Sequence, residues 1–296
     1  MAKIRKTVEG MRENTLFDLE KGNSENNTCQ KLISMLPYIA KMVILDRPEN
    51  ENFKRNSDDP NEHVVNWHQF GIITHTLLAW KSYQAEAQQY LKKWNINLKI
   101  SKKFQERIEG KSKSYLLQIS IIFHDLGKFA RNFKESNGRN EHDFYEHEAM
   151  SEKLIVENEF IYRLLHETFQ ITETQIKYIA RCAGLHFELG KARDASRKTT
   201  QGYSISFAHS EQCQKSCMEI ASKFPQFKEE IGILFLCDSL AKTDVRIDAE
   251  TDVEIENQTS HVENIIRERN LNPELIKAIK QLPVSIAIAR RYLESI

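Results

Sequence analysis

The feature that most constrains the fold is an apolar run, residues 115–123, that leads directly into the sequence His-Asp-Leu-Gly-Lys. The run, YLLQISIIF, is apolar almost all round, and a helix with that pattern is buried. His124 and Asp125 extend the buried segment. Because a buried carboxylate is costly unless it is paired or bound to a metal ion, we expect a polar site at the end of a core helix.

The composition favours helices. Glycine and proline number only 10 and 6 in 296 residues, whereas turn-rich β folds usually need more of both. Strong helix formers such as Leu, Lys, Glu, Gln and Ala are plentiful, so we expect an all-α fold. Apolar periodicity predicts helices over residues 29–45, 70–91, 114–128, 145–158, 172–187, 209–224, 227–245 and 273–295.

Charge and cysteine content point to a soluble, cytoplasmic protein. Lys plus Arg and Asp plus Glu both number 42, so the total charge demands neither nucleic acid nor an anionic membrane as partner. The five cysteines are scattered and odd in number, which does not fit a disulfide framework. The N-terminal sequence has no apolar segment after its basic residues, as a secretory signal would, and the apolar runs are too short to span a bilayer.

Four further residues share the setting of the His-Asp pair. His75 lies inside the apolar stretch FGIITHTLLAW, and His186 closes YIARCAGLH. His147 lies at a predicted helix start, and Asp238 is the one charge in IGILFLCDSLA. A lone buried histidine is more often a satisfied core residue than a ligand, and a histidine at a helix start is often a cap. A lone aspartate in so apolar a run is harder to explain structurally.

Taken in order, these residues form the set His, His-Asp, His, His, Asp, which resembles the HD superfamily of metal-dependent phosphohydrolases over roughly residues 60–250. The stretch NWHQFGIITHTLLAW is similar to the HD region of bacterial tRNA nucleotidyltransferases. HDLGKFARNF, with HEAMSEKL and a later Gly-Leu-His, is similar to the HD nuclease domains of CRISPR interference proteins. The chain has neither a nucleotidyltransferase strand pattern nor a helicase P-loop.

The resemblance implies a domain plan and a set of metal ligands. It implies an HD-domain helical bundle over residues 56–250, with a polar segment and accessory helix over 1–55 and accessory helices packed on the core over 251–296. One histidine stands at the Gly-Leu-His position where some relatives have two, so one or two ions are expected. The implied metal ligands are His75, His124, Asp125 and Asp238, with His147 and His186 added in two-metal members.

The implied activity is hydrolysis of a phosphomonoester or phosphodiester of a nucleotide or nucleic-acid end by a metal-activated hydroxide. Imidazole-rich sets with carboxylates favour the transition metals Mn, Fe, Co, Ni or Zn, and Mg is also allowed. Asp125 would be catalytic and the natural bridge between two ions. Two other functions stay open, a di-iron oxygenase of HD type and a non-catalytic HD-fold binding or regulatory module.

Basic residues near these positions are candidates for substrate binding. Lys128 is expected to contact phosphate and to stabilise the transition state, with Arg131 as a second candidate. Residues 190–202, GKARDASRKTTQG, are predicted to form a basic loop in which Lys191 and Arg193 recruit a phosphorylated substrate. The alternative for each is a solvated surface cation. The oligomeric state is left open. No role is assigned to His63, His68, His166 or His261, although His63 and His68 are close enough in sequence to His75 to line the pocket.

Overall fold

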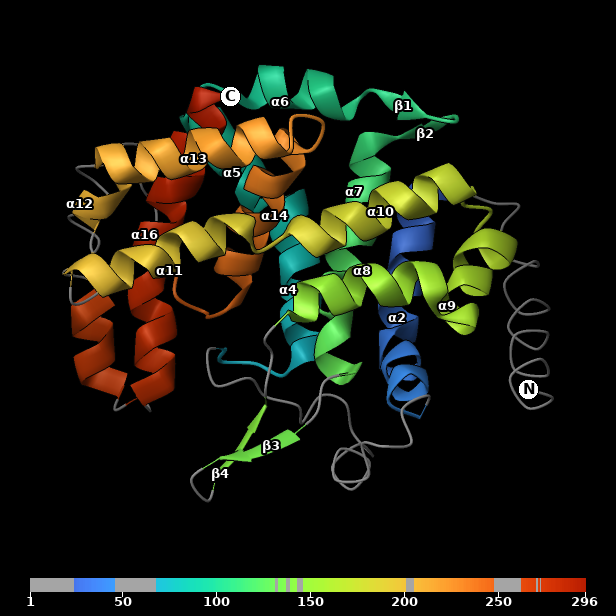
Figure 1. Cartoon of the computed structure of the whole chain (residues 1–296), viewed down its shortest axis with the longest axis horizontal. Coiled ribbons are helices and arrows are strands. Elements are labelled where there is room, and N and C mark those ends of the chain that lie inside the picture. The colour runs from blue at the N-terminus through green and yellow to red at the C-terminus, as the bar shows by residue number, and fades with distance from the viewer. Residues whose placement is uncertain are drawn as a thin grey trace. The chain divides into compact units, whose positions relative to one another are not determined.

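The structure, a computed structural model, describes residues 24–45, 68–130, 133–136, 139–142, 146–200, 205–247, 262–269, 271 and 273–296. Over these ranges the chain is helical apart from two short antiparallel hairpins, so the prediction of an all-α fold is confirmed (Figure 1). Among the helices of these ranges, none combines the length and the apolar character needed to cross a membrane.

The chain divides into two compact units, each built from two separated stretches of sequence. The first comprises Met1–Asp59 and Gln105–Gly184, and the second comprises Pro60–Phe104 and Leu185–Ile296.

The first unit places the His-Asp pair at the end of a buried helix. In this unit α2 packs against α7 and against the 3-10 helix η2, and α8 also packs against η2. Its elements are α2 (Ser24–Leu45), β1 (Arg107–Ile108), β2 (Lys111–Ser112), α7 (Lys113–Phe123), η2 (Leu126–Ala130), β3 (Phe133–Ser136), β4 (Arg139–His142), α8 (His147–Glu157), α9 (Glu159–Arg163), the π-helix η3 (Leu164–Thr168) and α10 (Glu173–Leu185).

The β1–β2 hairpin turns through two residues, Glu109 and Gly110, whose φ angles are 46° and 89°. Two-residue hairpin turns of this kind need positive φ at both central positions, which glycine adopts readily. The side chain of Gln175 donates a hydrogen bond to the Ile108 carbonyl at 2.7 Å, so the hairpin is tied to the start of α10.

The second unit is organised around α14. All residues from Glu229 to Ala241 are buried, because α14 packs against α4 on one side and against α11 and α16 on others. Residues 262–269 are also helical. The elements are α4 (Ile72–Gln84), α5 (Glu86–Lys93), α6 (Asn97–Phe104), α11 (Glu188–Thr200), α12 (Ile205–Ala208), α13 (Glu211–Lys223), α14 (Lys228–Ala241) and α16 (Pro273–Ser295).

One helix prediction and one loop prediction are wrong in detail. The helix predicted over 70–91 is interrupted at Ala85, where φ and ψ are −124° and −70°, so α4 and α5 are separate helices. The basic loop predicted over 190–202 is instead occupied largely by α11, which runs through Thr200. The segment is polar in composition, which predicts a solvated loop, yet Leu189, Ala192 and Arg193 are buried.

All five cysteines lie in the described part of the chain, where they are buried thiols with no disulfide between them. The prediction that they form no disulfide framework is therefore confirmed.

Candidate metal centre

The helix α7 stops immediately before the His-Asp pair. The hydroxyl of Ser112 caps its start by accepting a hydrogen bond from the Tyr115 amide at 3.2 Å. After His124 the backbone tightens into η2, and the amide of Lys128 donates to the carbonyl of Asp125 at 3.0 Å. This tighter turn brings the side chain of Lys128 back toward the carboxylate that precedes it.

A close backbone contact fixes this turn against α8. The hydroxyl of Ser151 lies 2.7 Å from the His124 carbonyl and 3.0 Å from the His147 carbonyl, and it accepts a hydrogen bond from the Gly127 amide at 2.8 Å. A Cβ atom on Gly127 would lie 2.1 Å from the His147 carbonyl oxygen. Only glycine therefore allows α8 to approach the turn and bring His147 beside Asp125.

Four buried side chains of the first unit form what we call the Asp125 group, which comprises His124, Asp125, Lys128 and His147. Oδ2 of Asp125 accepts a hydrogen bond from Nζ of Lys128 at 2.6 Å and lies 3.5 Å from Nε2 of His124. Oδ1 of Asp125 lies 3.3 Å from Nε2 of His147. The group thus surrounds one carboxylate with two imidazoles and an ammonium.

The electrostatics of the Asp125 group keep the carboxylate ionised. Burial by itself would raise the pKa of Asp125, because a charge is poorly solvated in the interior. His124, Lys128 and His147 act in the opposite direction and hold the pKa well below its usual range.

The orientation of His124 suits a metal ligand. Its Nδ1 lies 2.7 Å from the carbonyl oxygen of Ile121, so Nδ1 carries the proton and donates this hydrogen bond. In the neutral ring Nε2 then presents a lone pair to a carboxylate oxygen of Asp125. Nε2 of His124 and the Asp125 carboxylate are thus two electron-pair donors that face each other in a buried place, which suits a cation. A metal-binding histidine usually donates a hydrogen bond from its other ring nitrogen to a group such as a backbone carbonyl.

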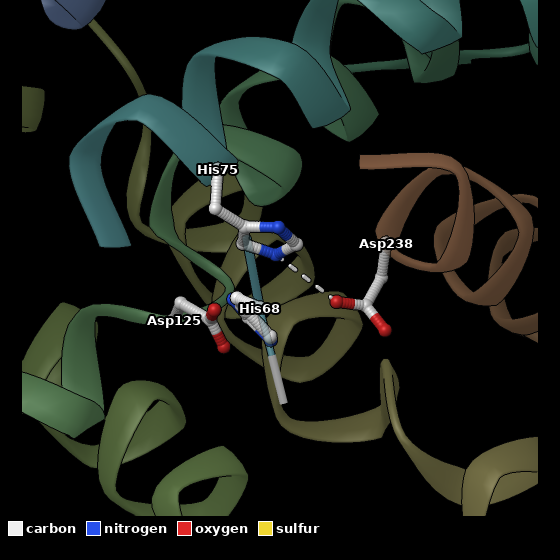
Figure 2. Close-up of side chains that lie close together, drawn as sticks. All are labelled: His68, His75, Asp125 and Asp238. Atoms are coloured by element: carbon white, nitrogen blue, oxygen red, sulfur yellow. Dashed lines mark hydrogen bonds and ion pairs between the residues drawn. The ribbon is translucent and has the colours of Figure 1, made fainter. Parts of the chain in front are cut away.

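The second unit contains a similar arrangement, which we call the Asp238 group and which comprises His68, His75, Asp238 and Lys242. Oδ1 of Asp238 lies 3.1 Å from Nε2 of His75, and its Oδ2 lies 2.8 Å from Nζ of Lys242. Figure 2 shows the imidazole of His75 directed at Asp238. The rings of His68 and His75 are 4.0 Å apart between centroids, and all four side chains are buried.

No role is assigned to His68 from the sequence. The structure places it next to the end of α14, because the amide of Gln69 donates to the Lys242 carbonyl at 2.8 Å and the Gln69 side chain accepts from the Asp244 amide at 2.9 Å. Its closeness in sequence to His75 is the one signal that points to it, since His68 itself precedes α4.

Both groups have donors that could hold a metal ion. His68, His75 and Asp238 each offer a ligand atom, and these atoms lie within 4.8 Å of one another. In the first unit, His124 and Asp125 also offer ligand atoms within that distance. Imidazole nitrogen together with carboxylate oxygen suits divalent transition metals such as Zn, Mn, Fe, Co or Ni. The prediction that six residues of the chain share one centre stays a prediction.

The remaining predicted residues have different settings. His186 follows α10 and is buried, with its ring 6.4 Å from that of Phe187. Lys191 is exposed on α11 and forms an ion pair with Glu188. Arg131 lies outside the described residues.

Arg193 is buried in the second unit instead of projecting from a loop. Its guanidinium donates to Oγ of Ser285 at 3.1 Å and to Asp194 at 3.0 Å. The same group lies over the rings of Phe187 and Phe235, at 5.7 and 5.9 Å from their centroids. These contacts give Arg193 a packing role in joining α11, α14 and α16.

Comparison of the chain with protein-family models, with curated proteins and with solved structures finds no match.

Proposed function

We propose that this protein is a metal-dependent phosphohydrolase that hydrolyses a phosphomonoester or phosphodiester of a nucleotide or nucleic acid. The observation that carries the proposal is the Asp125 group, in which two imidazoles and one ammonium lie within 3.5 Å of a single buried carboxylate. The group combines donors for a divalent metal with a cation suited to a phosphoryl oxygen. A neutral substrate would offer the buried ammonium of Lys128 no anionic oxygen to bind.

The residues of the group have separate roles in this proposal. Asp125 is ionised at neutral pH, because its neighbours hold the pKa of its carboxyl well below the usual range despite burial, and it therefore offers an anionic ligand. His124 is held in one orientation by the Ile121 carbonyl. When bound, the metal ion lowers the pKa of a coordinated water from about 15.7 toward about 7 and neutralises charge on phosphoryl oxygens. Lys128 donates a hydrogen bond to the phosphate and stabilises its developing charge.

The proposed metal ligands come from both groups. The burial of the two aspartates supports the proposal, since buried aspartate side chains are rare unless they are paired or bind an ion. We propose that one or two ions are bound, with Mn, Fe, Co, Ni or Zn as the preferred metals. The ligands are His75, His124, Asp125, His147, His186 and Asp238, as the resemblance to HD phosphohydrolases implies.

A turnover screen tests the activity. Purified protein is stripped with a chelator, reloaded with Mn²⁺, Co²⁺ or Ni²⁺, and incubated with nucleoside monophosphates, cyclic nucleotides and single-stranded oligonucleotides. We expect phosphate or nucleotide release that depends on added metal and is lost in Asp125→Asn. Glu157→Gln is the matched control, because Glu157 is a well-exposed carboxylate that forms an ion pair with exposed Lys153. No metal-dependent release with any of these substrates would contradict the proposal.

The same preparation separates the rival functions. Stoichiometric paired iron together with substrate-dependent oxygen consumption would identify an oxygenase. Tight binding of a nucleotide by calorimetry, with no product under any metal condition, would identify a binding module.

A further inference from the structure

Each group contains a lysine that forms an ion pair with its aspartate from nearby in the chain. Nζ of Lys128 lies 2.6 Å from Oδ2 of Asp125, three residues earlier, and Nζ of Lys242 lies 2.8 Å from Oδ2 of Asp238, four residues earlier. Both pairs are buried. The sequence predicts a role for Lys128 and none for Lys242.

The pair formed by Lys242 neutralises a carboxylate that a metal would also need. A buried carboxylate without a counter-charge is strongly unfavourable, so the ammonium stabilises Asp238 in metal-free protein. It does so at Oδ2, while Oδ1 faces His75. A divalent ion that binds the donors of His68, His75 and Asp238 therefore competes with the ammonium for the same carboxylate.

The side chain of Lys242 has a second partner within reach. Its Nζ lies 5.7 Å from the centroid of the Phe187 ring, a distance at which an ammonium is attracted by an aromatic face. Lysine has a flexible four-carbon stem and three rotatable donors. The ammonium can thus leave the carboxylate oxygen and stay close to it, with the aromatic ring still offsetting part of its desolvation.

We propose that Lys242 is an exchangeable counter-ion. Its ammonium holds Asp238 in the metal-free protein, yields the carboxylate oxygen to a divalent cation, and then binds a phosphate group carried by the substrate. The last step rests on the proposed function, whereas the exchange with the metal does not. Charge balance supports the binding of phosphate. A divalent ion added to a neutral lysine–aspartate pair leaves two positive charges, which a phosphate dianion neutralises.

Calorimetry on the full chain tests the exchange. Mn²⁺ is titrated into metal-free wild type, Lys242→Met, Lys242→Arg and the control Lys153→Met, which removes an exposed lysine from an exposed ion pair. Inorganic phosphate is then titrated into each Mn²⁺-loaded protein. We expect Lys242→Met to bind Mn²⁺ at least tenfold more tightly and phosphate at least tenfold more weakly than wild type. Lys242→Arg and Lys153→Met should stay within threefold of wild type in both titrations.

Unchanged or weaker Mn²⁺ binding by Lys242→Met, or unchanged phosphate binding, would overturn the proposal and leave the pair as a permanent structural contact. Absence of Mn²⁺ binding to wild type would overturn it as well. Turnover is a separate readout. If both affinities change as expected and no phosphoester is hydrolysed, the proposed function alone fails.

A measurement on the wild-type fold covers the case in which Lys242→Met does not fold. The protein is labelled with ¹⁵N-lysine, and the ammonium signal of Lys242 is assigned by its loss in Lys242→Arg. We expect this signal to shift when Zn²⁺ is added and to shift again when phosphate follows. A signal that stays in place on Zn²⁺ binding would show that the lysine does not exchange.

Discussion

Nε2 of His75 lies 3.1 Å from Oδ1 of Asp238, although 163 positions of sequence separate the two residues. The contact exists because α4 and α14 pack closely along their lengths. His75 is fully buried and Asp238 nearly so. Two buried polar side chains between packed helices are unfavourable unless they form a hydrogen bond or an ion pair. The contact of His75 with Asp238 is the chemical centre of the second unit.

Replacing Asp125 with asparagine should remove metal binding and destabilise the fold. The ammonium of Lys128 would stay buried without its carboxylate, which typically costs about 3–5 kcal/mol. We expect metal content after dialysis against Mn²⁺ to fall at least tenfold, as measured by elemental analysis, and the urea midpoint to fall with it. Glu157→Gln should change neither quantity. Full metal content in Asp125→Asn would exclude this carboxylate as a ligand.

Replacing Gly127 with alanine should separate α8 from the turn. The new Cβ would lie 2.1 Å from the His147 carbonyl oxygen, and overpacking of this kind costs about 1–3 kcal/mol or more because backbone atoms must move. We expect a clear loss of unfolding free energy in urea. Gly184→Ala is the control, since its Cβ would chiefly meet the flexible side chain of Glu152. Equal effects of the two changes would contradict the close backbone approach.

Replacing Ser151 with alanine should loosen the same turn without adding volume. The Gly127 amide would lose its hydrogen-bond acceptor, and leaving a buried donor unsatisfied costs about 1–3 kcal/mol. We expect faster hydrogen exchange at Gly127 together with lower stability in urea. Ser34→Ala removes an exposed hydroxyl bonded to a carbonyl of its own helix and should be near neutral. Unchanged exchange at Gly127 would show that the hydroxyl does not hold the turn.

Stability should decrease in alkaline solution. Burial, reinforced by Glu25, raises the pKa of Cys29 from 9.0 to about 12. The unfolded chain ionises this thiol near pH 9, so its contribution to stability is complete below pH 9 and is lost as the pH approaches about 12. Each such group lowers the unfolding free energy by about 1.4 kcal/mol per pH unit in that range. Burial also raises the pKa of Tyr90, Tyr115, Cys237 and Tyr292.

Urea titrations between pH 7 and pH 11 measure this effect. We expect a plateau up to about pH 8.5 and a steep decrease above pH 9. Cys29→Ala should show a shallower decrease, because one ionisable group is removed from the unfolded chain. A plateau that extends to pH 11 would contradict the burial of these groups.

Replacing Arg193 with methionine should affect stability more than substrate binding. The guanidinium is buried against two aromatic rings and Ser285, and its loss should cost about 2–4 kcal/mol through lost packing and hydrogen bonds. Lys191→Met should be near neutral, because Lys191 is exposed. A phosphate affinity that falls in Arg193→Met while its urea midpoint is unchanged would support the substrate-binding role predicted from the sequence.

The all-α architecture could be predicted because it depends on averages over many residues. Scarce glycine and proline, together with long apolar periodic runs, exclude most alternatives to helices. The helix predicted over 227–245 corresponds to α14 (Lys228–Ala241), which is buried from Glu229 to Ala241. The His-Asp pair was also recognisable, because charge at the end of a wholly apolar run needs an explanation.

Other features depend on contacts that a single sequence does not reveal. The break at Ala85 has no glycine or proline to mark it. The helix α11 is stabilised by the tertiary contacts of its buried residues Leu189 and Arg193. A segment rich in lysine and arginine, taken by itself, predicts an exposed loop. His68 precedes α4 and is not itself helical, so helical periodicity does not connect it with His75.

Both buried aspartates have an ammonium partner only three or four positions along the chain. Zinc fingers, by contrast, lack such internal compensation and stay unfolded until an ion arrives. This protein can therefore reach its folded state with no ion present, because each of these buried carboxylates has its own counter-charge close by in the chain.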